Sequence, residues 1–288
     1  ISLHEETLGE PPGRAFNEVS ARALLGIAKN DLGANFVRLA HYPHAEVMTR
    51  VADEMGLLVW SEIPVYWDVD FDNPETLALA KKMQRENIMR DRNRASIIFW
   101  SVANETPQTD ERLVFLEKMI DDARQLDGTR LMTAALHNVR GEGGVYVVDD
   151  PLAKLIDVVA VNTYQGWYGR APLKRVPTLE WLNPSGKPFL FSEFGAGALY
   201  GFEDPGLEKF SEDFQAEYYR VTLEMVKKVP GLTGLSPWIL KDFHSPRRMH
   251  HAYQDYWNRK GIISPAGDKK QAFFVLRDYY SELAGQGR

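Results

Sequence analysis

The sequence predicts an α/β protein built as one (β/α)8 barrel of the TIM type. Short apolar runs, typical of strands buried on both faces, alternate with helical patterns eight times along the chain. Two of these runs end in a carboxylate, which is common at the mouth of such a barrel. The 288 residues suffice for one large barrel and show no linker or internal repeat. We therefore expect a single domain over residues 1–288.

The first half of the chain supplies four strand–helix pairs. The helical pattern of residues 46–55 is followed by Gly56, a natural stop, and Pro74 follows a capping residue at Asp72 or Asn73. Strands are expected at residues 1–5, 36–40, 57–61 and within 96–106, and helices at 17–30, 46–55, 74–92 and 111–126.

The second half continues the alternation with shorter elements. A glycine-rich loop joins the fifth and sixth strands, and Gly141–Gly144 is interpreted as a flexible turn. Strands are expected at residues 131–136, 158–161, 189–192 and 232–239, and helices at 151–156, 178–182, 211–229 and 270–283. A doubly wound open sheet is the alternative fold, but its usual dinucleotide fingerprint is missing.

Composition excludes several classes of function. The net charge of −6 argues against a nucleic-acid partner, since phosphate binding needs a basic surface. No apolar run approaches the roughly 20 residues that a membrane helix needs, so we expect no membrane partner and a soluble protein, with the cytoplasm favoured. The chain has no cysteine, so it has no disulfide and no thiolate metal site. It begins at Ile1 rather than at Met, and we expect a processed or excised segment of a longer protein.

Two glutamates carry the functional hypothesis. Glu105 follows the apolar run Ile97–Trp100, and Glu193 follows the run that starts at Phe189. Parallel strands of a barrel all end at one rim, so closure brings both carboxylates together. Hydrolysis of a glycosidic bond needs such a pair, one acid for the leaving oxygen and one carboxylate for the anomeric carbon or for water. A lone glutamate in a loop is usually only solvated, but the pair favours glycoside chemistry.

The segment 241–260 is basic in an otherwise acidic chain. It holds five lysine or arginine residues against two aspartates. A basic loop at a barrel mouth would suit a sugar that bears a carboxylate, and a solvated run of charges is the alternative. Before it, Trp238 ends the eighth strand, where an indole can stack on a sugar ring or serve as a core aromatic.

Other chemistries find no support. His41 and His44 are not part of an HxH or HExxH pattern, so we expect no metal. Gly195–Gly197 is too short for a dinucleotide loop, and no Gly-x-Ser-x-Gly elbow is present. We therefore expect no cofactor.

Four segments together resemble the catalytic barrel of glycoside hydrolase family 2. They are GANFVRLAHYPH (33–44), WSVANE (100–105), VNTYQGWY (161–168) and FSEFGA (191–196). That family includes β-galactosidases, β-mannosidases and β-glucuronidases, and the resemblance extends over about residues 1–280. Its members usually carry β-sandwich domains before the barrel, and this sequence shows none.

The resemblance implies a retaining mechanism, with Glu105 as acid/base and Glu193 as nucleophile about 5–5.5 Å apart. It also implies roles in substrate binding or orientation for residues around them. Asn104 is expected to bind the sugar 2-hydroxyl, and Tyr164 to orient the nucleophile. Arg38 is expected either to keep Glu193 ionised or to form a structural ion pair under the rim. The remaining expected sugar contacts are His41, Tyr168 and Trp238.

The same resemblance bears on specificity. Asn258 and Lys260 match the Asn-x-Lys motif with which β-glucuronidases grip the uronate carboxylate. Gln254 stands where those enzymes often carry an arginine, and the Arg247–Arg248 pair is a candidate replacement. Glu6 stands where the family commonly shows aspartate in the site.

The sequence therefore favours a retaining exo-β-glycosidase acting on a small-molecule or oligosaccharide glycoside, with β-D-glucuronides as expected substrates. A β-galacturonidase or β-galactosidase of the same family is the alternative specificity. A non-catalytic carbohydrate-binding barrel is the alternative of another class. Assembly into homo-oligomers is left open.

Overall fold

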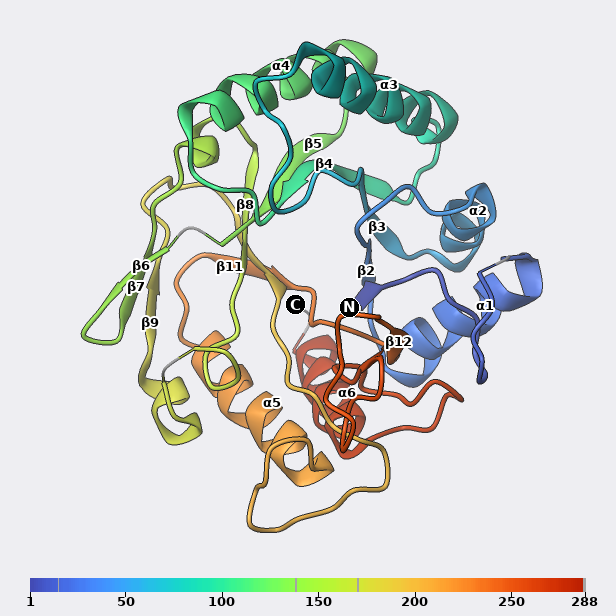
Figure 1. Cartoon of the computed structure of the whole chain (residues 1–288), viewed down its shortest axis with the longest axis vertical. Helices are drawn as coiled ribbons and strands as arrows, with labels where there is room; N and C mark the ends of the chain where they lie inside the picture. The colour runs from blue at the N-terminus through green and yellow to red at the C-terminus, as the bar shows by residue number, and fades with distance from the viewer. Residues whose placement is uncertain (15, 138, 170, 287–288) are drawn as a thin grey trace.

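The computed structural model describes residues 1–286 except 15, 138 and 170, and it contains one curled, parallel, eight-stranded sheet. The strands lie side by side in chain order and surround a central axis with helices outside them (Figure 1). They are β1 (Ser2–Leu3), β2 (Phe36–Leu39), β3 (Leu58–Glu62), β4 (Ile97–Asn104), β5 (Leu131–Leu136), β8 (Val158–Asn162), β10 (Phe189–Glu193) and β11 (Leu232–Leu235). The predicted barrel strands are thus confirmed, with shorter first and last strands than expected.

The chain beyond β11 closes the ring against β1. The Ser2 backbone N–H donates to Pro237 O at 3.0 Å, and the Leu240 N–H donates to Ser2 O at 3.0 Å. The hydroxyls of Ser2 and Ser236 are hydrogen-bonded at 2.9 Å. Because these contacts join the last strand to the first, the predicted (β/α)8 barrel is the observed fold.

The helices pack outside the sheet, and side chains cap their first turns, at Asn73 as one of the two predicted alternatives. Asn73, Thr109 and Ser211 each accept a hydrogen bond from a backbone N–H in the first helical turn. Gly56, with φ of 65°, ends the second helix in the left-handed conformation that suits glycine. The helices are α1 (Glu18–Gly26), which continues as the π-helical turn η1 (Ile27–Asp31), then α2 (Glu46–Met55), α3 (Pro74–Asp91), α4 (Asp110–Leu126), α5 (Glu212–Val226) and α6 (Gln271–Gly285).

The prediction of a helix at residues 178–182 is wrong. Residues Leu173–Thr178 form a 3-10 helix, η3, and Glu180–Leu182 form strand β9. Trp181 is buried and stacks on Tyr146 with ring centroids 4.9 Å apart, while its two neighbours are exposed. This alternation is the period of a strand, and pairing of β9 with β7 (Val145–Val148) decided the conformation.

The glycine-rich segment between β5 and β8 is also more ordered than expected. It is an antiparallel hairpin of β6 (Val139–Glu142) and β7, with the predicted turn reduced to Gly143 and Gly144 at positive φ. The helix expected at 151–156 is a 3-10 turn, η2 (Pro151–Lys154). A short ribbon of β12 (Phe243–His244) and β13 (Trp257–Asn258), which the sequence did not indicate, lies within the basic segment.

Strand alternation explains why the barrel interior changes from apolar to charged. Phe36 and Arg38 share one face of β2, and Trp60 and Glu62 share one face of β3. The Arg38 guanidinium lies over the Trp60 ring, 5.0 Å from its centroid, so the charged layer rests directly on the apolar one. The apolar floor consists of Phe36, Trp60, Phe99, Ala135, Val158, Ala160 and Leu190.

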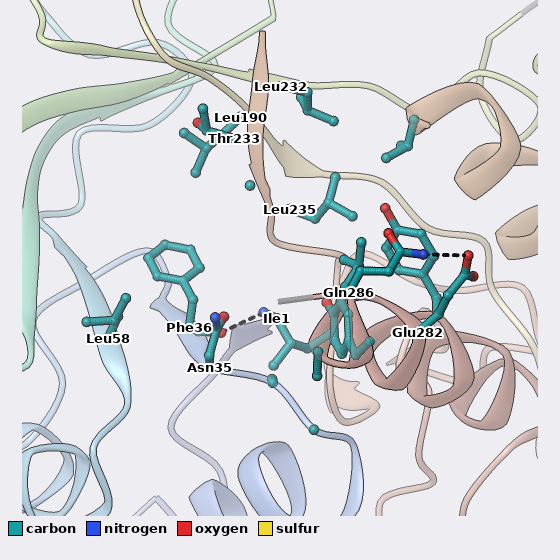
Figure 2. A pocket seen from close by; sticks show the side chains of 18 of the residues that line it. Ile1, Asn35, Phe36, Leu58, Leu190, Leu232, Thr233, Leu235, Glu282 and Gln286 are labelled. Carbon is teal, nitrogen blue, oxygen red and sulfur yellow. Dashed lines mark hydrogen bonds between the residues drawn. The ribbon is translucent and has the colours of Figure 1, made fainter. Parts of the chain in front are cut away.

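A cavity of about 900 Å³ lies at the amino-terminal end of the strands, below this floor (Figure 2). Its lining includes Phe36, Leu58 and Leu190 from the strands and Tyr279 from α6. None of the predicted site residues lines it, so this cavity is separate from the rim that carries the carboxylates. Among the described residues, no helix combines the length and apolar character needed to cross a membrane.

Candidate active site

Glu105 and Glu193 lie at the carboxyl ends of β4 and β10, on the same rim of the barrel. Asn162, at the end of β8, donates from Nδ2 to Glu105 Oε1 at 2.9 Å and to Asn104 Oδ1 at 3.1 Å. The Tyr164 hydroxyl donates to Glu193 Oε2 at 2.7 Å. Arg38 completes the network, because it bonds both Asn104 and Glu193. The two predicted catalytic side chains thus belong to one hydrogen-bonded cluster; their predicted separation stays a prediction.

Arg38 is fully buried beneath this cluster. Its Nη1 donates to Glu193 Oε1 at 2.8 Å, and its Nη2 lies 3.1 Å from Glu62 Oε1. Burial alone acts to lower the pKa of Arg38, but the two carboxylates outweigh it and hold the pKa above its ordinary value. Both arrangements expected for Arg38 are therefore present, because it pairs with Glu193 and also with Glu62. A part for Arg38 in substrate binding stays a prediction.

Burial raises the pKa of the Glu193 carboxyl above its ordinary value, and the neighbouring Glu105 charge acts in the same direction. Arg38 and the Tyr164 hydroxyl oppose this rise. Burial and the two glutamates raise the pKa of Tyr164 itself well above its usual range, so its phenol remains a neutral donor. Arg38 and Tyr164 thus favour the ionised form of the Glu193 carboxyl, which burial disfavours.

Glu62 is a third strand-end carboxylate in this cluster, and the sequence analysis gave it no role. Burial opposes its ionisation, but Arg38 and His41 outweigh burial and lower the pKa of Glu62. Trp60 donates to it from Nε1 at 2.8 Å. The sequence did contain a pattern that could have indicated Glu62, because it ends an apolar strand run, as Glu193 does.

Asn104 presents its amide in a fixed orientation. Its Oδ1 accepts from Arg38 at 2.7 Å and from Asn162 at 3.1 Å. Because both partners donate, the atom that they contact must be the amide oxygen, which settles the orientation of the amide. The amide nitrogen Nδ2 makes no hydrogen bond within the part of the chain described. This free donor suits the predicted contact with a sugar hydroxyl.

Glu105 has a strained backbone, with φ of 51° in the left-handed region. Such a conformation costs about 1–3 kcal/mol for a residue other than glycine and is frequent at functional sites. The Glu105 N–H donates to Ala135 O at 2.8 Å, which holds the residue in place. Trp67, from the loop after β3, donates from Nε1 to Glu105 Oε2 at 3.1 Å. No sequence pattern indicated Trp67 or Asn162 as partners of Glu105.

His41 and Trp238 form a stacked pair on the rim, with ring centroids 4.8 Å apart. His41 Nδ1 lies 2.8 Å from Glu62 Oε1, and its Nε2 lies 3.8 Å from Glu193 Oε1. Trp238 is only 5% exposed and also packs edge-on against His4. The indole is therefore largely a packing residue here, and its expected stacking on a sugar stays a prediction.

Lys260 is a second buried cation, and unlike Arg38 it is surrounded by aromatic rings. It is 3% exposed, and its ammonium donates to the Tyr168 hydroxyl at 2.6 Å. The rings of Tyr164, Trp167 and Tyr168 surround it at 4.6–5.9 Å. Among the described residues, no carboxylate lies within ion-pair distance of it. Burial lowers the pKa of Lys260, although the neighbouring Tyr168 opposes this.

The charge of Arg248 also acts on this cluster. Burial acts to raise the pKa of Tyr168, but Lys260 and Arg248 outweigh it and lower that pKa. Asn258 is buried beside Lys260, and its Oδ1 accepts from the Lys260 backbone N–H at 3.2 Å. The structure therefore places Tyr168, an expected sugar contact, beside Lys260 and Asn258, which are expected to recognise a carboxylate.

Two other cations of the basic segment, Lys241 and Arg259, lie near carboxylates. Lys241 lies 3.5 Å from Glu6, and Arg259 lies 3.5 Å from Asp242. Glu6 is buried and also pairs with Arg14 at 2.8 Å. Its carboxylate contacts these cations rather than the Glu105–Glu193 network, so the geometry gives no support to its predicted substrate contact. In the described chain, no group of three or more histidine, aspartate or glutamate side chains is arranged to hold a metal ion.

Comparison with known sequences gives a family for the whole barrel. The family described as "Glycosyl hydrolases family 2, TIM barrel domain" matches residues 4–284. A β-glucuronidase of Sus scrofa is 32% identical over 272 residues, covering 89% of this chain and 40% of the relative. A β-glucuronidase of Streptococcus agalactiae is 29% identical over 293 residues, covering 93% of this chain and 47% of the relative. The chain thus spans less than half the length of these relatives.

Solved structures share the fold. A family 2 β-galacturonidase from Eisenbergiella tayi bound to galacturonate superposes with a TM-score of 0.84 at 27% identity, covering 98% of this chain and 50% of that one. A β-D-glucuronidase of Dictyoglomus thermophilum gives a TM-score of 0.86 at 25% identity, with the same coverage of 98% and 50%.

Proposed function

This chain belongs to the TIM barrel domain family of glycosyl hydrolases family 2, and from that premise we propose that it hydrolyses terminal β-D-glucuronides with retention of configuration. Glu105 is the acid/base, and Glu193 is the nucleophile. The shared hydrogen-bond network of the two carboxylates supports these roles. No cofactor enters the reaction.

The proposed reaction has two steps. In the first, a Glu193 oxygen attacks the anomeric carbon, the bond to the leaving oxygen breaks, and Glu105 gives its proton to that oxygen. In the second, Glu105 takes a proton from water as the water oxygen attacks the anomeric carbon and releases Glu193. Arg38 and Tyr164 hold Glu193 for attack, and the free Nδ2 of Asn104 faces the sugar 2-hydroxyl.

The observation that carries the uronide specificity is the unpaired charge of Lys260. A buried ammonium without a carboxylate partner is costly, so the site is prepared for a ligand that brings the negative charge. The 6-carboxylate of a uronic acid supplies it, and a neutral galactoside or mannoside does not. We expect Tyr168, Asn258 and Arg248 to bind this carboxylate as well.

Galacturonide is the second candidate substrate. Gln254 replaces the arginine that β-glucuronidases often carry, and the Eisenbergiella tayi relative is a β-galacturonidase bound to galacturonate. The two sugars differ in the configuration of one hydroxyl and carry the same carboxylate. The Lys260 cluster therefore selects uronides as a class, and a comparison of the two epimers decides between them.

A panel of chromogenic β-glycosides tests the proposal. We expect β-glucuronide to exceed β-galactoside and β-mannoside in kcat/KM, and preferential turnover of a neutral sugar would contradict the specificity. Lys260→Ala should lower kcat/KM for the uronide about 100-fold, because it removes the cation paired with the substrate carboxylate. Lys209→Ala is the matched control, since Lys209 lies 5.0 Å from the Trp167 ring but does not bond Tyr168.

A non-catalytic barrel would bind a uronide without forming a covalent intermediate. A 2-fluoro uronide with a good leaving group should leave an adduct on Glu193, found by mass spectrometry of peptides. Binding of uronate without an adduct and without turnover would favour the non-catalytic alternative.

A further inference from the structure

The loop after β3 places an aromatic residue directly beside the proposed acid/base. The Asn104 N–H donates to Val65 O, and the Trp67 N–H donates to Asn104 O, each at 2.9 Å, so this loop extends along the end of β4. The indole Nε1 of Trp67 donates to Glu105 Oε2 at 3.1 Å. Trp67 is nevertheless 46% exposed, so much of its ring is available for contact.

A second loop reaches the same ring from the basic segment. The Arg247 guanidinium lies over Trp67, 4.8 Å from the ring centroid, at a distance typical of a cation–π contact. Backbone hydrogen bonds hold its loop, with the Ser245 N–H donating to Tyr256 O and the Tyr256 N–H donating to Arg248 O, each at 2.7 Å. Arg247 is exposed, and among the described residues no carboxylate pairs with it.

The proposed role of Glu105 as acid/base determines which part of a bound glycoside lies beside Trp67. Glu105 must contact the leaving oxygen, so the group beyond that oxygen, the aglycone, lies next to Glu105 on the side away from Glu193. An aglycone in that position contacts Trp67, which holds the second oxygen of Glu105. Tyr66, packed against His41 on one side and Trp67 on the other, continues the aromatic surface towards the sugar-binding rim.

Resting on the proposed function, we propose that Trp67 and Arg247 form an aglycone subsite for a second acidic sugar. Trp67 supplies a surface for the sugar ring, and Arg247 binds the acidic group. Arg247 is the exposed counterpart of Lys260, since both cations have no carboxylate partner in the described chain. The natural substrate is then an oligosaccharide with negative charge on both sides of the bond to be cleaved.

A matched pair of aryl β-glucuronides tests this subsite in the full chain. One carries a carboxylate on the aglycone ring and the other a neutral carboxamide of similar size. We expect Arg247→Ala to lower the carboxylate-to-carboxamide ratio of kcat/KM about tenfold, equivalent to about 1.4 kcal/mol. Arg247→Glu should lower the ratio further by repulsion. Arg277→Ala is the control, because Arg277 is an exposed arginine stacked 5.1 Å from the Phe274 ring on the outer helix α6.

The outcomes separate the subsite from the proposed function. An unchanged ratio in Arg247→Ala, or an equal loss on both substrates, overturns the acidic subsite and leaves glucuronide hydrolysis intact. A carboxylate-to-carboxamide ratio that is lower in the wild type than in Arg247→Ala also overturns the acidic subsite. Absence of turnover of both substrates by the wild type overturns the proposed function, and the subsite with it. Trp67→Phe keeps an aromatic surface, so a retained ratio in that variant supports a charge effect of Arg247.

Discussion

Arg38 and Lys260 are two buried cations of the same barrel mouth, and their surroundings are opposite. Arg38 touches two carboxylates, Glu62 and Glu193, which hold its pKa above the ordinary value. Lys260 touches aromatic rings and one phenol, and burial lowers its pKa. Carboxylates of the protein itself pair with Arg38, whereas we propose that a ligand supplies the negative charge for Lys260. Under the proposed function, the first region fixes the reacting groups and the second selects the substrate.

The largest expected effect comes from removing the carboxylate that Arg38 holds. Glu193→Gln keeps the shape of the side chain but removes the attacking oxygen anion. We expect kcat for a β-glucuronide to fall about 10⁴-fold or more, as in other enzymes that lose a nucleophile. Glu224→Gln on the exposed surface of α5 is the control. Activity of Glu193→Gln near the wild-type level would show that the Arg38 region does not contain the reacting group.

The two cations should differ in what they contribute to stability. Arg38→Met leaves two buried carboxylates unpaired, so we expect the free energy of unfolding to fall by about 3–5 kcal/mol. Lys260→Met removes a buried charge that has no carboxylate partner, so a change below about 1 kcal/mol, or a gain, is expected. Urea denaturation followed by circular dichroism measures both.

Arg112→Met provides the matched control for this comparison. Arg112 is buried and paired with Asp150 at 2.7 Å, and it contacts neither Glu62 nor Glu193, although its Nε donates to the Thr106 hydroxyl at 2.8 Å. It should lower stability as Arg38→Met does while kcat of the folded enzyme is retained. A loss of stability in Lys260→Met as large as that in Arg38→Met would contradict the distinction between a paired and an unpaired cation.

The smallest expected effect concerns the tuning of Glu193 by Tyr164. Tyr164→Phe removes a hydrogen bond that lowers the pKa of Glu193, so that pKa should rise further above its ordinary value. The nucleophile must be ionised, so the acidic limb of the kcat/KM profile should move to higher pH. The value at the optimum should fall about tenfold, as expected for a hydrogen bond to a charged group. A limb that stays in place, or moves to lower pH, would show that Tyr164 does not act on Glu193.

Much of the fold was predictable because each element depends on local spacing. Apolar runs of strand length and helical repeats are visible without knowledge of the neighbours. The exception, residues 178–182, shows the limit of this approach. Trp181 needs Tyr146 and the pairing with β7 to become part of a strand, and these contacts are remote in the sequence.

The candidate site was predictable where a side chain follows a strand. Glu105 and Glu193 were found in this way, and Glu62 satisfied the same criterion but was not used. Trp67 lies in an irregular loop, and its contact with Glu105 bridges 38 positions of the chain. No periodic pattern marks such a contact, because loop conformation depends on what the loop packs against.

The sequence by itself determined the alternation of strands and helices and the polar residues at strand ends, because side-chain direction repeats every two residues in a strand. The tertiary structure alone decided which charges find partners. Arg38 meets Glu193 across 155 positions of the chain only because the sheet closes into a ring. Within the described residues, Lys260 meets aromatic rings and no carboxylate for the same reason, since closure fixes which loops share the mouth. Charge pairing depends on distance in space, and distance across a closed barrel is not a property of any local stretch of sequence.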